Sequence, residues 1–148
     1  MARQRNLDNL RTEKKGMDVL MSADAGFYIP TAEEKRKLYS LLGIEYKRYS
    51  RSVDCIQLLV PRIEDVTNQD DFNLIEVKTT RSSSVKELPF GVFFGITENE
   101  ESLFRQVGNY RLCIIHIVLK SYYTMGYDEY VSLIQRKRVQ YQVNFLPK

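Results

Sequence analysis

The sequence predicts an α/β domain built on a single mixed β-sheet with flanking helices. Two capping-box sequences, at 31–34 and 97–100, each begin a segment whose leucine and phenylalanine residues have helical spacing. Short β-rich segments lie around them, and a nearly continuous apolar run at 110–119 is typical of a strand buried on both faces of a sheet. The expected element order is α-β-β-β-β-α-β-α-β.

In the first half of the chain, Thr31 and Glu34 form the capping box of a helix that Gly43 ends. Gly16 is expected to end an N-terminal arm or short, poorly packed helix. The following segments are rich in β-branched and aromatic residues, which predicts strands. We expect an arm over residues 1–15, a loop over 23–30 and a helix over 31–43. A hairpin over 44–60, a polar loop over 61–71 and a third strand over 72–80 should follow.

In the second half, Thr97 and Glu100 form the other capping box, and Gly108 is expected to end its helix. Tyr127, Val131 and neighbouring apolar residues have the i, i+3, i+4, i+7 spacing of a last helix. We expect a Ser-rich connection over residues 81–86, a strand over 89–96 and a helix over 97–108. A strand over 110–119, a helix over 127–138 and an alternating edge strand over 139–145 should follow.

Composition narrows the class of protein. The chain has 148 residues, 43% hydrophobic and 28% charged, which is typical of one globular domain and excludes disordered, collagen-like and coiled-coil chains. No apolar run approaches the ~18 residues of a membrane helix, and the basic N-terminus lacks the apolar core of a secretory signal. We therefore expect a cytoplasmic protein without a membrane partner, with an N-terminal arm and short segment at 1–22 and a single domain at 23–148.

The expected strand at 72–80 carries two charges in an apolar setting. Glu76 and Lys78 are two residues apart, so both side chains point to one face of the sheet, while Ile75 and Val77 point to the other. Because a buried unpaired charge is costly, such a pair is kept for mutual pairing, for a metal, or for both.

Asp54 is a matching charge in the preceding strand. If the two strands pair antiparallel, Asp54 and Glu76 can lie at the same end and form an oxygen-ligand site suited to Mg²⁺. Lys78 would then orient a water molecule or stabilise charge that develops on phosphorus. Zinc chemistry is disfavoured, because the chain has a single histidine, His116, and Cys55 and Cys113 lie in apolar runs without metal-ligand spacing.

Asp54 followed by Glu76-Val-Lys78 resembles the motif of the PD-(D/E)XK nuclease superfamily, and the layout over residues 31–119 is similar to restriction-endonuclease-like and Holliday-junction-resolvase-like domains. The resemblance implies a core of a helix bearing an acid, a three-strand meander and a helix–strand return. It implies catalytic roles for Asp54, Glu76 and Lys78, with Asp54 and Glu76 holding Mg²⁺, for which Mn²⁺ can substitute. Val53 stands where the family often has proline.

Some site assignments stay open at the sequence level. Asp71 or Asp65 can replace Asp54 as the second carboxylate. Glu34 is the candidate for the helix acid of the family, although a capping-box glutamate needs no catalytic role. Gln106 and Tyr110 have the spacing of the QxxxY motif of RecB-like members. Candidate contacts to nucleic acid are Thr79, Thr80, Arg81, Lys35, Lys37 and Gln106.

The distribution of charge fits a polyanionic substrate with a bound cation. Residues 1–51 and 105–148 carry net charges of +4 and +5, whereas residues 52–104 carry −6. The prediction is a Mg²⁺-dependent DNA endonuclease, acting as a homodimer or with a partner subunit if both strands are cut. The alternatives are a catalytically inactive nucleic-acid-binding domain, an accessory subunit of a restriction or defence complex, and an RNA-processing nuclease.

Overall fold

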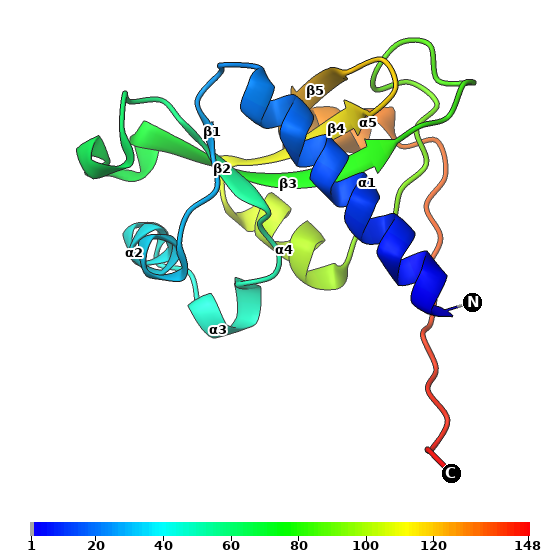
Figure 1. Cartoon of the computed structure of the whole chain (residues 1–148). Helices are drawn as coiled ribbons and strands as arrows, with labels where there is room; N and C mark the ends of the chain where they lie inside the picture. Colours follow the sequence, from blue (N-terminus) through cyan, green and yellow to red (C-terminus); the bar gives the residue numbers. More distant parts are fainter. Residues whose placement is uncertain (1) are drawn as a thin grey trace.

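One mixed sheet organises the protein (Figure 1). The computed structural model describes the backbone of residues 2–148 and the side chains from Leu10 onward. The strands are β1 (Phe27–Tyr28), β2 (Cys55–Leu58), β3 (Phe72–Thr80), β4 (Tyr110–His116) and β5 (Ser121–Met125). The helices are α1 (Ala2–Ser22), α2 (Ala32–Leu42), α3 (Tyr46–Tyr49), α4 (Glu98–Gln106) and α5 (Tyr127–Leu133), with 3-10 turns η1 (Ile63–Asp65) and η2 (Gln69–Asp71). The predicted α/β class with a single mixed sheet is confirmed.

The strand order β1-β2-β3-β4-β5 follows the chain, but one pairing is parallel. Strands β1, β2 and β3 form an antiparallel meander, β3 and β4 are parallel, and β4 and β5 are antiparallel. A parallel pair needs a crossover connection, and residues 81–109 supply it with α4 inside. Strand β3 therefore lies in the middle of the sheet: its residues 72–75 pair with β2, and its residues 74–80 pair with β4.

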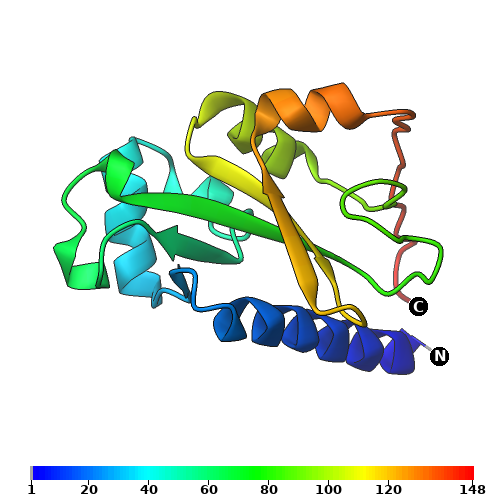
Figure 2. The same ribbon diagram turned by 90° about the horizontal axis from the view of Figure 1, so that it is seen from above.

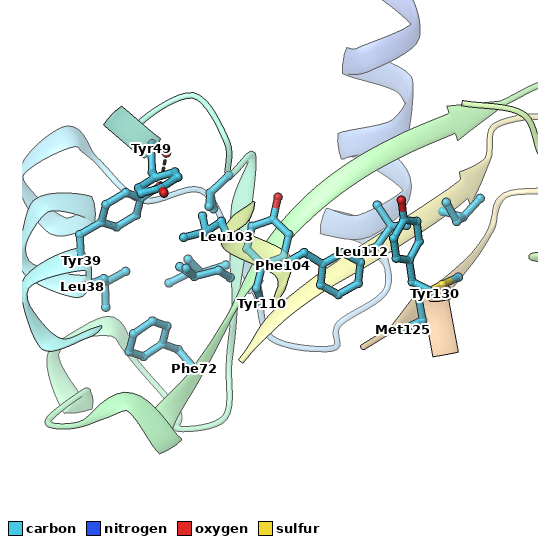
Figure 3. Packing of buried hydrophobic residues seen from close by; sticks show 14 of the residues in the cluster. Leu38, Tyr39, Tyr49, Phe72, Leu103, Phe104, Tyr110, Leu112, Met125 and Tyr130 are labelled. Carbon is cyan, nitrogen blue, oxygen red and sulfur yellow. Dashed lines mark hydrogen bonds between the residues drawn. The ribbon is translucent and has the colours of Figure 1, made fainter. Parts of the chain in front are cut away.

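The two faces of the sheet are covered unequally (Figure 2). Helix α1 covers one face, where Leu20 packs on Ile75, Ile115 and the two free cysteines, Cys55 and Cys113. The other face is covered by the remaining helices and holds the larger aromatic core. That core includes Leu38, Tyr39, Tyr49, Phe72, Leu103, Phe104, Tyr110, Leu112, Met125 and Tyr130 (Figure 3).

Two buried tyrosine hydroxyls attach the segment before β2 to this core. Tyr39 donates to the carbonyl of Tyr49, and Tyr110 donates to the carbonyl of Ser52, each over 2.7 Å. These bonds engage backbone acceptors at the end of α3 and in the irregular segment before β2. The segment that carries Asp54 is thereby held against the sheet.

Both capping-box helices are confirmed. In α2, the Thr31 hydroxyl accepts from the Glu34 N–H, and Gly43 ends the helix in the left-handed conformation at φ 67°. In α4, Thr97 and Glu100 make the same reciprocal bonds. The second helix ends at Gln106, before the expected stop at Gly108, because Val107 already has an extended backbone.

The predicted arm at the N-terminus is wrong in its extent and in its packing. Helix α1 continues through Gly16 to Ser22, and Gly16 is buried against β3. A Cβ atom at Gly16 would lie 2.8 Å from Cγ2 of Thr79. Glycine is needed there for close approach of helix to sheet, and it does not end the helix.

Two of the strands predicted between residues 44 and 96 are absent. Residues 44–50 contain α3, because Tyr46 and Tyr49 lie one helical turn apart and pack inward. In residues 89–96, where a strand is predicted, Phe93 is exposed between partly buried Val92 and Phe94. They begin with a turn, in which the Val92 N–H donates to the Pro89 carbonyl and Gly91 is left-handed at φ 79°, and they form no strand.

The C-terminal part also differs from the prediction. The strand predicted at 110–119 ends at His116, and β5 follows it, in a segment for which we expected no element. The predicted helix at 127–138 ends at Leu133, and the alternating segment 139–145 is no strand. Its apolar residues, among them Val139, are exposed. None of the described helices is long and apolar enough to cross a membrane.

Gly16→Leu should destabilise the protein by about 1–3 kcal/mol, because the added side chain meets Thr79 at the helix–sheet contact. The measurement is the free energy of unfolding in denaturant. Lys15→Leu, at the exposed neighbouring position of α1, is the control and should change stability by less than about 0.5 kcal/mol. Equal stabilities of the two variants would contradict the packing of α1 on β3.

Candidate active site

The candidate site is built on β3, where the alternation of the strand separates charge from the apolar face. Glu76 and Lys78 lie on the face of Leu74 and the aromatic core, whereas Ile75 and Val77 lie on the face covered by α1. The predicted shared face of Glu76 and Lys78 is therefore confirmed.

Glu76 is the most deeply buried carboxylate of the site, with 4% of its surface exposed. Its Oε1 lies 3.4 Å from Nζ of Lys78. Its Oε2 is buried and has no hydrogen-bond partner among the described residues. An orphaned buried carboxylate oxygen in a native fold calls for an explanation, such as a bound ion or a catalytic role.

Lys78 has a second carboxylate partner, Glu100, whose Oε1 lies 2.9 Å from Nζ. Glu100 is 6% exposed and occupies the first turn of α4. Its Oε1 also accepts from the backbone N–H of Thr97, as part of the capping box. The crossover helix thus delivers a buried acid to the charged face of β3.

The shared environment determines where protons reside. Burial raises the pKa of Glu76 to about 10, and the charges of Asp54 and Glu100 add to this effect. Burial alone would raise the pKa of Glu100, but hydrogen bonds from the Thr97 N–H, Lys78 and the protonated Glu76 outweigh it and lower that pKa. Burial alone would lower the pKa of Lys78, but its two acidic partners raise it. At neutral pH, Lys78 and Glu100 form an ion pair and Glu76 holds a proton.

Asp54 lies at the edge of this cluster, one residue before β2. Cys55 is opposite Ile75 in the antiparallel register, so continuing that register by one residue places Asp54 opposite Glu76. The Asp54 N–H donates to the Ile75 carbonyl over 2.9 Å, and the Val77 N–H donates to Oδ2 of Asp54 over 2.7 Å. The register thus places Asp54 opposite Glu76, while Lys78 contacts Glu76 and Glu100.

Lys35 of α2 braces the segment that carries Asp54. Its Nζ donates to the carbonyls of Ser50 and, over 2.9 Å, Val53. Burial lowers the pKa of Lys35, although the charges of Asp54 and Glu76 oppose the shift. We expected Lys35 as a contact to nucleic acid; the structure turns its ammonium group inward, toward the backbone beside the site.

The donor set fits a hard divalent cation held by few protein ligands. Among the described residues, no group of three or more His, Cys, Asp or Glu side chains could hold a metal. Mg²⁺ is commonly bound by one or two carboxylates, with waters and substrate phosphates completing its shell. Asp54 and the orphaned Oε2 of Glu76 could supply such a pair.

The alternative carboxylates lie elsewhere. Glu34 accepts hydrogen bonds from the Thr31 N–H and from the hydroxyl of Tyr28, and it lines a separate cavity of about 120 Å³. Asp71 is occupied by the backbone of the turn before β3, and Asp65 pairs with Arg62. The structure does not bring Glu34, Asp65 or Asp71 into contact with Lys78.

The remaining predicted contacts to nucleic acid are scattered. Thr79 faces α1 at Gly16, and the Arg81 guanidinium donates to the hydroxyl of Thr12 in the same helix. The Thr80 hydroxyl accepts from the backbone after the strand, and Lys37 lines the cavity beside Glu34. Gln106 bonds Ser102 on its own helix, and its QxxxY partner Tyr110 is a core residue.

Glu100 is the member of the site that sequence reasoning missed. The signal that could have found it is the capping box at 97–100, which follows the Glu76/Lys78 strand and opens the crossover helix. We assigned it a purely local role. His116, in contrast, is satisfied by Ser82 and Leu119, as expected for a core histidine.

Lys35→Met should destabilise the protein by about 1–3 kcal/mol, because the carbonyls of Ser50 and Val53 lose their partner. The measurement is the free energy of unfolding. The matched control is Lys37→Met, at an exposed position on the same helix, which should change stability by less than about 0.5 kcal/mol. If both variants were as stable as the wild type, Lys35 would not brace this segment.

Glu76→Gln should remove a pH dependence of stability in metal-free buffer. The folded pKa of about 10 exceeds the unfolded value, so the folded state binds the extra proton and stability falls as pH rises between the two values. The contribution reaches about 1.4 kcal/mol per pH unit. Unfolding from about pH 5.5 to about pH 8, below the range of ordinary thiols, should show a steeper loss for the wild type than for Glu76→Gln. Parallel curves would contradict the protonation of Glu76.

Comparison with protein-family models, with curated proteins and with solved structures gives no match for this chain.

Proposed function

We propose that the protein is a metal-dependent DNA endonuclease that hydrolyses phosphodiester bonds. The observation that carries the proposal is the orphaned Oε2 of Glu76, buried beside Lys78 and across the register from Asp54. Without a cation the buried Glu76 holds a proton, and a divalent cation bound at this carboxyl group would take the place of that proton.

The topology supports the resemblance to the PD-(D/E)XK superfamily. The antiparallel meander β1–β2–β3 is followed by a helix and a parallel strand, as the resemblance implies. Asp54 stands at the start of the second of these strands and Glu76-Val-Lys78 on the third. The helix acid differs: Glu100 of the crossover helix contacts Lys78, whereas Glu34 does not.

Each site residue has a chemical task in this proposal. A bound Mg²⁺ supplies a Lewis acid that polarises the phosphodiester and lowers the pKa of its water. Asp54 and Glu76 would hold it. Lys78 would place its ammonium group beside the phosphate and stabilise the charge that develops there. Glu100 keeps Lys78 ionised and fixes its position.

A second candidate function is an accessory subunit that binds DNA or a partner without cutting. It is favoured by the exposed apolar alternation of the C-terminal segment. Val139, Tyr141, Val143 and Phe145 are between 73% and 93% exposed, as in a strand that lacks its partner. Such a segment would also serve a homodimer or a larger nuclease complex.

The test is cleavage of supercoiled plasmid, single-stranded DNA and branched DNA with Mg²⁺ or Mn²⁺. Wild type should nick at least one substrate, and Glu76→Gln and Lys78→Met should each lose roughly a hundredfold or more in rate. Glu33→Gln and Lys86→Met, at exposed positions outside the site, are matched controls and should keep the wild-type rate.

Binding of Mn²⁺, followed by electron paramagnetic resonance, gives a second readout that does not depend on turnover. It should weaken in Glu76→Gln and persist in the controls. If the wild type binds DNA but neither cleaves it nor binds Mn²⁺, the enzyme proposal is overturned and the accessory subunit is favoured.

A further inference from the structure

A cavity of about 500 Å³ opens beside the buried acid–lysine cluster. It lies between α3, the segment leading to β2 and the N-terminal turn of α4. Its lining residues are Lys47, Arg48, Ser50, Arg51, Ser52, Thr97, Asn99 and Glu100. Glu100 is shared with the candidate site, because its carboxylate also contacts Lys78. The cavity and the cluster are therefore adjacent.

The walls of this cavity are suited to anions. Lys47, Arg48 and Arg51 are exposed cations, while the single carboxylate among the lining residues, Glu100, is engaged with Lys78 and the Thr97 N–H. Neither Lys47 nor Arg51 forms an ion pair with any residue that the structure describes. Their charges are available for a ligand.

Arg48 is held in place before any ligand arrives. Its Nε lies 3.4 Å from Oδ1 of Asn99, and Nδ2 of Asn99 lies 3.3 Å from the Arg48 carbonyl. Its guanidinium also lies 4.9 Å from the centre of the Tyr49 ring. These contacts tie Arg48 of α3 to Asn99 in the first turn of α4, the turn that also carries Glu100.

The lining also indicates which part of a polyanion would enter. No lining residue is aromatic, so the cavity offers no platform on which a base could stack. Its volume lies within the ~300–1,000 Å³ of ligand clefts, enough for a phosphate with part of its sugar. Ammonium, guanidinium and hydroxyl groups are the side chains that bind phosphates without reading sequence.

We propose that this cavity binds the sugar–phosphate backbone of a nucleic acid strand next to the bond to be cut, through Lys47, Arg48 and Arg51. The inference rests on the proposed nuclease function and adds to it a substrate subsite. It makes binding independent of sequence and strongly dependent on salt.

The test is the double variant Lys47→Ala/Arg51→Ala, which removes two cations without disturbing the Arg48–Asn99 contacts. Fluorescence anisotropy of a labelled single-stranded oligonucleotide, in metal-free buffer at several salt concentrations, measures affinity. Affinity should fall roughly tenfold, and the slope of log affinity against log salt should fall by about 1.4 for two lost phosphate contacts. An unchanged slope would overturn the subsite.

The matched control is Lys14→Ala/Lys15→Ala, which removes the same charge from exposed positions of α1 on the opposite face of the sheet. It should bind as tightly as the wild type, and thermal unfolding checks that both variants are folded. An equal loss of affinity in this control would show a diffuse charge effect and overturn the inference.

The outcomes separate this inference from the proposed function. Cleavage by the wild type together with undiminished binding by the Lys47/Arg51 variant would leave the nuclease and reject the subsite. Selective loss of binding in that variant, with a wild type that cuts nothing, would keep the subsite and reject the enzyme. Binding of a phosphopeptide in preference to DNA and RNA oligonucleotides would also reject the subsite.

Discussion

The constraint on which the site depends is the burial of three ionisable groups on one face of the central strand. Glu76 and Lys78 lie beyond the stretch of β3 that pairs with β2, yet their side chains are only 6% and 16% exposed, because helices cover this face of the sheet. Charges in such a place need close partners. Glu100 is the partner that satisfies Lys78, and it leaves Glu76 protonated with one oxygen unmatched. The cluster is therefore more than a structural ion pair in which every charged or polar atom has a partner, because Oε2 of Glu76 has none among the described residues.

The parallel pairing of β3 with β4 brings Glu100 to this cluster. The chain must leave β3 at one end and return to begin β4 at the other, so α4 crosses the charged face. Its first turn then lies above Lys78, and the same turn contacts α3 through Asn99 and Arg48. One crossover thus positions the acid, the lysine and the basic wall of the adjoining cavity.

Local signals in the sequence predicted the elements whose ends are marked by residues next to them in the chain. The capping boxes located α2 and α4, and the period of two placed Glu76 and Lys78 on one face. Signals that depend on partners failed: residues 139–145 alternate like an edge strand, but they pair with none of the described strands. Gly16 was misinterpreted because its role is a contact with Thr79, which is distant in sequence. Strand pairing and helix–sheet contact are tertiary facts, and alternation alone does not carry them.

The two capping boxes show how far such local reasoning extends to function. Glu34 and Glu100 occupy the same position in the same motif, and each bonds the N–H of its own N-cap threonine. Helix α2 turns Glu34 toward Tyr28, whereas α4 turns Glu100 toward the lysine of β3. The residue that α2 does direct at the site is Lys35, the next along the helix, because about 100° of rotation separates successive side chains. The sheet topology places α4 over β3, and for this reason Glu100 lies at the site and Glu34 does not. The capping-box motif alone does not distinguish the two glutamates.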